Sequence, residues 1–187
     1  MYSDKYSLCF QPDQVVIAQV KAMKLQLAEV IGWYNSKNSL AHLTIAEFSA
    51  SEKDIARMHQ QIMRCCNGFS PVETHLNAFG TYPNGTFFLA VDAFAKPILK
   101  AYAQTLFQTL QLKKAYKCTD PHLSIGRKLE DAKIQQAYAL FDTPSLFFQC
   151  NQLVLRRLNL ERRQFDIIEI YPFLSQDTEE EIQLTLF

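Results

Sequence analysis

The sequence lacks any net charge, because its 19 lysine and arginine residues balance 19 aspartate and glutamate residues. Proteins that bind nucleic-acid backbones or anionic membranes over a large surface usually carry a basic excess. The balance therefore excludes a general electrostatic attraction to either, and it predicts that any phosphate binding is local. It also favours a small or short substrate over a long polyanion.

The sequence also lacks paired cysteines, a metal-ligand spacing and a long apolar run. It has five cysteines but no CxxC pair, and the odd number disfavours a closed disulfide framework. Asp4 and Lys5 lie where a secretory signal needs apolar residues, and no stretch approaches 18 apolar residues. We therefore predict a soluble, cytoplasmic protein without membrane contact, with buried and reduced cysteines, and we expect a monomer.

Hydrophobic periodicity predicts strands interleaved with helices. Strands are predicted at 6–10, 38–48, 122–127, 147–160 and 165–173, with a two-stranded hairpin over 72–91. Helices are predicted at 12–32, 51–66, 97–110 and 134–141. Asn84 and Gly85 favour a tight hairpin turn, because both residues tolerate positive φ. Such hairpins favour an α+β fold over a parallel, doubly wound sheet.

The two halves of the chain repeat the same order of elements, with an offset of 80 residues. The first unit covers about 5–91 and the second about 86–173, so the segment FFLAV closes one and opens the other. We interpret residues 1–187 as one domain of two interlocked lobes. The acidic tail, 174–187, is interpreted as a solvated end in preference to an interaction segment.

The tetrapeptide HLTI at 42–45 recurs as HLSI at 122–125, in the same place in each half. In a strand, the period of two puts His and the hydroxyl residue on one face and the two apolar residues on the other. One such motif is commonly a half-buried strand histidine with an incidental hydroxyl. Two of the chain's four histidines in equivalent positions indicate a shared site.

The residue types in this pair suit phosphate chemistry. Histidine titrates near neutrality, so one imidazole can accept a proton from a nucleophile while the other gives a proton to a leaving oxygen. His42 and His122 are the candidates for these roles, although the repeat does not say which is acid and which is base. The hydroxyls of Thr44 and Ser124 can donate hydrogen bonds to phosphate oxygens as charge develops.

These motifs resemble those of the 2H phosphoesterase superfamily, especially its 2′-5′ RNA ligase and cyclic phosphodiesterase branch. The likeness extends over nearly the whole chain, and it includes the segments FGTYP and LVLRRLNL and the strand FDIIEIYPF. It implies a duplicated bilobal α+β fold, with two mainly antiparallel sheets facing a central cleft and helices packed outside. Glu47 and Leu158 depart from the common pattern, since many relatives have an aromatic or apolar residue and a serine there.

The resemblance also implies a metal-independent enzyme with no cofactor. It implies action on 2′,3′-cyclic phosphate or 2′-5′ linkages, in the hydrolytic or the ligation direction. The partners would be RNA ends, short oligonucleotides or cyclic nucleotides. By the same resemblance, His42 and His122 transfer protons, and Thr44 and Ser124 hold the phosphate. A rival interpretation is a non-catalytic nucleotide or RNA-end binding module with the same cleft, and a plain scaffold would keep the two histidines apart.

Four further residues are candidate substrate contacts. Arg127 could neutralise a phosphate, but strand alternation puts it opposite His122 unless the strand ends or bends at Gly126. Tyr82 and Phe88 could stack on a base, although hairpin aromatics more commonly pack internally. Arg157 belongs to a basic concentration that suits RNA contact or a solvated hairpin tip, made of Arg156, Arg157, Arg162 and Arg163.

Overall fold

The computed structural model describes residues 4–176, in which strands and helices alternate along the chain. The strands are β1 (Asp4–Phe10), β2 (Leu43–Ala50), β3 (Val72–Tyr82), β4 (Thr86–Val91), β5 (Tyr116–Lys117), β6 (His122–Gly126), β7 (Leu146–Cys150), β8 (Gln152–Asn159) and β9 (Gln164–Pro172). The helices are α1 (Gln14–Ile31), α2 (Glu52–Gly68), α3 (Ala95–Leu110) and α4 (Asp131–Leu140). Residues 177–187, most of the predicted acidic tail, lie outside the described part.

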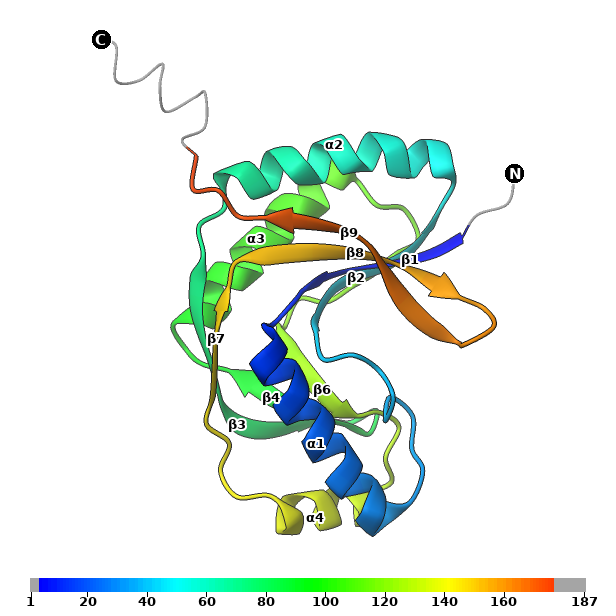
Figure 1. The fold of residues 1–187 in the computed structure, drawn as a ribbon, viewed down its shortest axis with the longest axis vertical. Helices are drawn as coiled ribbons and strands as arrows, with labels where there is room; N and C mark the ends of the chain where they lie inside the picture. Colours follow the sequence, from blue (N-terminus) through cyan, green and yellow to red (C-terminus); the bar gives the residue numbers. More distant parts are fainter. Residues whose placement is uncertain (1–3, 177–187) are drawn as a thin grey trace.

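The described strands form one strongly curled sheet in the order β7-β3-β4-β6-β2-β1-β8-β9, with β5 paired to β2 (Figure 1). Every pairing between these strands is antiparallel, so the predicted α+β class is confirmed and the doubly wound alternative is wrong. A single residue pair, Leu43 with Leu123, joins β2 to β6. The sheets of the two lobes are therefore continuous, and they meet at the centres of the two repeated motifs.

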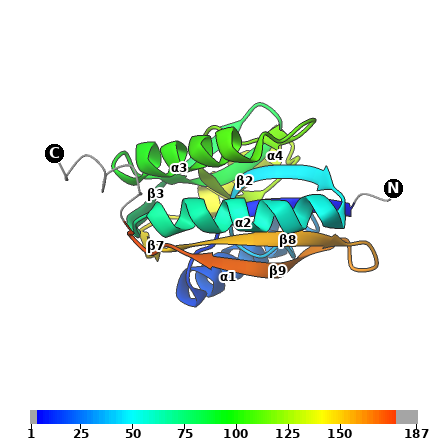
Figure 2. The same ribbon diagram turned by 90° about the horizontal axis from the view of Figure 1, so that it is seen from above.

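The helices form two pairs at opposite ends of the molecule. Helix α2 packs against α3, and α1 packs against α4. Figure 1 shows α2 and α3 at the top and left and α1 and α4 at the bottom, and Figure 2 shows β8 and β9 between α2 and α1. No helix in the described part of the chain is long and apolar enough to cross a membrane.

Capping contacts confirm the predicted starts of α1 and α2, whereas α3 begins at Ala95, before Pro97, and α4 begins at Asp131, before the predicted residue 134. The side chain of Asp13 accepts a hydrogen bond of 2.9 Å from the backbone N–H of Val16 at the start of α1. Ser51 and Asp54 form a reciprocal capping box at the start of α2. Gly32 ends α1 with a φ of 75°, a left-handed value that favours glycine.

The segment 147–160 is the one predicted strand that the structure divides. β7 ends at Cys150 and pairs with β3, whereas β8 begins at Gln152 and pairs with β1. β7 is therefore the strand at one edge of the sheet, β8 lies next to β9 at the other edge, and the chain crosses between β7 and β8 at Asn151. Both pieces contain apolar residues in strand-like patterns, so periodicity alone did not reveal the break.

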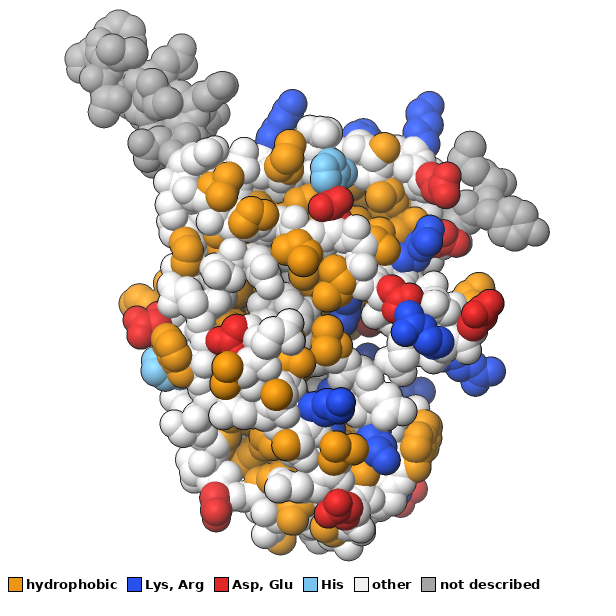
Figure 3. Space-filling view, viewed as in Figure 1, with side chains coloured by type: hydrophobic (Ala, Val, Ile, Leu, Met, Phe, Trp, Pro, Cys, Tyr) orange, Lys and Arg blue, Asp and Glu red, His pale blue; other side chains and the backbone are white. Residues whose placement is uncertain are grey.

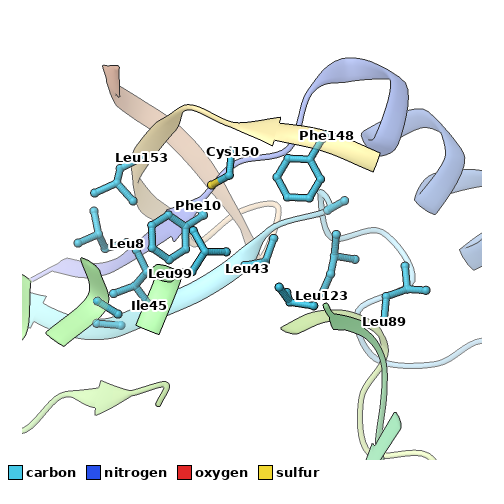
Figure 4. Packing of buried hydrophobic residues seen from close by; sticks show 14 of the residues in the cluster. Leu8, Phe10, Leu43, Ile45, Leu89, Leu99, Leu123, Phe148, Cys150 and Leu153 are labelled. Carbon is cyan, nitrogen blue, oxygen red and sulfur yellow. The ribbon is translucent and has the colours of Figure 1, made fainter. Parts of the chain in front are cut away.

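The apolar residues of both motifs are the centre of the core. Leu43 and Leu123 have no exposed surface, and Ile45 is 1% exposed. Figure 4 shows them packed with side chains from the neighbouring strands and α3, including Leu8, Phe10, Leu89, Leu99, Phe148, Cys150 and Leu153. Because successive strand residues face opposite sides, this burial turns His42, Thr44, His122 and Ser124 toward the other face.

The five cysteines are free, and all but the half-buried Cys65 are buried.

Candidate active site

One pocket of about 410 Å³ brings the two repeated motifs together. It is lined by His42 and Thr44 from the first motif and by His122 and Ser124 from the second. The remaining lining includes Lys5, Ser39, Glu47, Tyr82, Tyr116, Arg127, Lys128, Arg156, Arg163 and Phe165. In Figure 3, lysine and arginine side chains gather where the β8–β9 hairpin overhangs the middle of the molecule. The two histidines line one pocket, so the separation that would have supported a plain scaffold is not observed.

The pairing of β2 with β6 explains this juxtaposition. Leu43 pairs with Leu123 in an antiparallel register, so His42 lies across from Ser124 and Thr44 lies across from His122. All four side chains are half-buried, whereas the apolar residues between them are buried. The four polar side chains of the two motifs therefore line the same pocket.

The two imidazoles are held in the same way. Nδ1 of His42 lies 2.5 Å from the carbonyl oxygen of Leu40, and Nδ1 of His122 lies 2.7 Å from that of Asp120. A carbonyl oxygen can only accept, so each Nδ1 donates and carries a proton. In the neutral imidazoles, Nε2 therefore keeps its lone pair. This tautomer leaves both Nε2 atoms available to accept or, after protonation, to donate.

The surroundings of the two imidazoles differ in charge. Burial lowers the pKa of His42 well below its usual value, the Arg156 guanidinium lowers it further, and the Leu40 carbonyl opposes them. Burial also lowers the pKa of His122, but the carbonyl and the carboxylate of Asp120 oppose that shift. His42 is accordingly the imidazole more strongly held in its neutral form.

Asp120 is the centre of a polar network that the sequence reasoning missed. Its carboxylate lies 2.6 Å from Nζ of Lys96 and accepts a hydrogen bond from the hydroxyl of Tyr82. Burial alone would raise the pKa of Asp120, but the bonds from Lys96 and Tyr82 lower it. The Tyr82 hydroxyl also lies 3.4 Å from Nδ1 of His122. The position of Asp120, two residues before a motif histidine, is the only sequence signal for this network.

The two candidate aromatic contacts have different places. Tyr82 lines the pocket, whereas Phe88 lies outside its lining and is only 8% exposed. The Phe88 ring stacks on Tyr82 at a centroid distance of 4.5 Å and lies 4.9 Å from the ring of His122. Phe88 covers Gly80, where an added Cβ would come within 2.5 Å of its ring. Its contacts thus support the His122 side of the pocket from behind.

The two candidate arginines also have different places. Arg127 lines the pocket because β6 ends at Gly126, after a bulge at which one step on β4 matches two on β6. Arg157 lies outside the pocket, and its guanidinium is 3.8 Å from the carboxylate of Asp4. The preceding residue, Arg156, lines the pocket and is 3% exposed. Arg156 pairs with Ser7 in an unbroken register of β8 with β1, so strand alternation turns its side chain away from the face of the buried Leu155 and toward the pocket.

Glu47, the unexplained departure in the first motif, also lines the pocket. Its carboxylate lies 3.3 Å from Nζ of Lys5 on the neighbouring strand. The remaining two histidines lie outside the pocket lining: Nδ1 of His59 is 3.1 Å from the hydroxyl of Tyr171, and the ring of His75 packs on Phe147. Among the described residues, no group of three or more His, Cys, Asp and Glu side chains is arranged to hold a metal ion.

The family model of the 2′-5′ RNA ligase superfamily matches residues 12–162. The chain belongs to this superfamily. The resemblance indicated by the paired motifs is therefore confirmed. No curated protein matches the sequence closely enough to give a nearer relative.

Solved structures confirm the fold of this superfamily member. Escherichia coli LigT complexed with 3′-AMP has a TM-score of 0.68 and 12% identity, covering 94% of this chain and 100% of that chain. TT0787 of Thermus thermophilus has a TM-score of 0.65 and 16% identity, covering 92% and 100%. Kluyveromyces marxianus Usb1 has a TM-score of 0.56 and 13% identity, covering 90% and 98%. At these identities the likeness establishes the bilobal LigT-like fold alone.

Proposed function

We propose that the protein is a metal-independent phosphoesterase that acts on RNA-type 2′,3′-cyclic phosphate or 2′-5′ phosphodiesters by two-histidine acid–base catalysis. The observation that supports it best is one pocket lined by both imidazoles and both hydroxyls, with each Nδ1 bonded to a carbonyl. E. coli LigT has been solved with 3′-AMP, ATP and phosphate, which supports a nucleotide phosphate as the ligand class. Five free cysteines suit action in the cytoplasm.

In the hydrolytic direction, Nε2 of neutral His42 accepts a proton from water as the water oxygen attacks phosphorus. The bond between phosphorus and one ribose oxygen breaks, and protonated His122 gives its Nε2 proton to that oxygen. Thr44 and Ser124 donate hydrogen bonds to the non-bridging oxygens, and Arg127 offsets their charge. The same sequence of proton transfers forms a 2′-5′ linkage when a ribose 5′-hydroxyl replaces water: the bond from that oxygen to phosphorus forms, the bond between phosphorus and the 3′ oxygen breaks, and His122 protonates the 3′ oxygen.

Turnover separates this proposal from a non-catalytic binding module. The wild type is expected to convert a nucleoside 2′,3′-cyclic phosphate or a cyclic-phosphate oligonucleotide, with or without EDTA, to a product identified as 2′- or 3′-phosphate. His42→Ala and His122→Ala are each expected to lose about 10³-fold in kcat, the scale of positioned proton transfer. Binding of 3′-AMP without turnover of any of these substrates would favour the binding module. Activity lost with EDTA and restored by zinc or magnesium would contradict the metal-independent mechanism.

A further inference from the structure

Arg156 carries a buried charge that no carboxylate of residues 4–176 pairs with. It is 3% exposed, and its Nη2 donates a hydrogen bond of 2.9 Å to the hydroxyl of Ser7. Its buried Nε has no hydrogen-bond partner, and no carboxylate in the described part of the chain lies within 4 Å of the guanidinium. The ring of Phe165 lies 5.4 Å from the guanidinium carbon. Among the described residues, the guanidinium is thus in contact with a hydroxyl and an aromatic face.

Such a residue destabilises the folded state. Arginine stays charged in proteins, so it cannot relieve its burial by losing a proton. An unpaired buried cation is destabilising, and natural proteins keep such features mainly at functional sites. Because Arg156 also lines the pocket that holds both histidines, an anion bound in that pocket would supply the missing counter-charge.

A second buried cation lies near the same side of the pocket. Lys24 is 2% exposed, and its Nζ donates to the carbonyl and hydroxyl oxygens of Ser39, which lines the pocket. Burial, together with the charge of Arg156, lowers the pKa of Lys24 to about 8. Glu47, the carboxylate in the pocket lining, is paired with Lys5. The His42 side therefore has an excess of positive charge that its own carboxylate does not offset.

We propose that Arg156 binds a non-bridging oxygen of the phosphate on which His42 and His122 act, from the His42 side and facing Arg127 across the pocket. The ligand class is a nucleotide phosphate, and this part of the inference rests on the proposed function. The location of the site rests on the buried guanidinium. It gives the reacting phosphate one arginine from each half of the sheet, Arg127 after β6 and Arg156 in β8. A guanidinium suits this role because its planar donors match a pair of phosphate oxygens.

Phosphate binding tests the inference independently of turnover. Calorimetric titration of the full chain with inorganic phosphate is expected to show that Arg156→Met binds at least about tenfold more weakly than the wild type, the scale of a charge-assisted hydrogen bond. Arg157→Met is the matched control, since it removes the neighbouring, exposed arginine outside the pocket, and it is expected to bind like the wild type. Wild-type affinity in Arg156→Met, equal losses in both variants, or no phosphate binding by the wild type would overturn the inference.

Thermal unfolding separates a ligand role from a structural one. Without phosphate, Arg156→Met is expected to have a Tm equal to or above that of the wild type, because it removes an unpaired buried charge. A lower Tm with unchanged phosphate affinity would assign Arg156 to stability alone and overturn the inference. If Arg156→Met does not fold, Arg156→Lys replaces it: about tenfold weaker binding supports the inference, and wild-type binding contradicts it. Phosphate binding through Arg156 without turnover of cyclic phosphates would support this site and reject the proposed function.

Discussion

At the scale of single residues, the two motif histidines are equivalent in sequence but not in surroundings. In both, Nδ1 donates a hydrogen bond to the carbonyl oxygen two residues earlier, so Nε2 is the nitrogen left for proton transfer. Arg156 adds positive charge near His42, and Asp120 adds negative charge near His122. Opposite neighbouring charges move the two pKa values apart, which is how a pair of identical side chains can take the base and acid roles.

The pH profile of kcat/KM is expected to be bell-shaped. Activity rises with pH as His42 loses its proton, well below pH 6.5, and falls as His122 loses its proton, at a pKa that burial lowers from 6.5. Asp120→Asn removes the negative charge that raises the pKa of His122, so the falling limb is expected to move to lower pH while the rising limb stays. Rate profiles of both proteins between pH 4.5 and 9 check this. If Asp120→Asn moved only the rising limb of the profile, His122 would be the base and His42 the acid.

The four polar residues of the motifs could be identified from sequence because the spacing of two between histidine and hydroxyl follows from the alternation within a single strand. Arg127 was expected to reach the pocket only if its strand ended or bent at Gly126, and β6 does end there. Arg157 lies outside the pocket because alternation along β8 turns Arg156 toward it, and Phe88 lies outside it behind the ring of Tyr82. Leu153, Val154 and Leu155 are all apolar, so the sequence does not show which face of β8 is the core side.

At the scale of elements, the β3–β4 hairpin supports the segment that carries Arg127. Gly85 accepts a hydrogen bond of 2.9 Å from the backbone N–H of Leu129. Its φ is 77°, and an added Cβ would lie 2.3 Å from the carbonyl oxygen of Leu129. The Asn84-Gly85 turn was predictable from residue type, but its contact with a segment more than 40 residues later required the fold.

Gly85→Ala is expected to displace residues 127–129 and to raise the KM for a cyclic-phosphate substrate, in addition to lowering stability by about 3 kcal/mol. Gly32→Ala is the matched control, because Gly32 also has positive φ but nothing lies within 4 Å of an added Cβ. It is expected to lower stability by about 1–3 kcal/mol with an unchanged KM. Urea unfolding and steady-state kinetics measure the two effects. An unchanged KM in Gly85→Ala would show that the hairpin does not position Arg127.

At the scale of the whole molecule, the duplication explains the site. The two lobes meet at the pairing of Leu43 with Leu123, so the centres of the motifs are also the seam of the sheet. The repeated element order predicts two units along the chain, but each half of the sheet takes strands from both: β3 and β4 join β6 and β7, and β8 and β9 join β1 and β2. The continuous sheet and the division of 147–160 between its two halves were not predictable, since they depend on pairing between distant strands.

The central claim is that His42 and His122 act as one acid–base pair, and the most direct test compares kcat in the wild type, the two single alanine variants and the double variant. Groups that act in one step are not additive. Each single variant is expected to lose about 10³-fold, and the double variant is expected to lose little more. Losses that multiply in the double variant, or a single variant that keeps near wild-type kcat on a nucleoside 2′,3′-cyclic phosphate, would contradict the account.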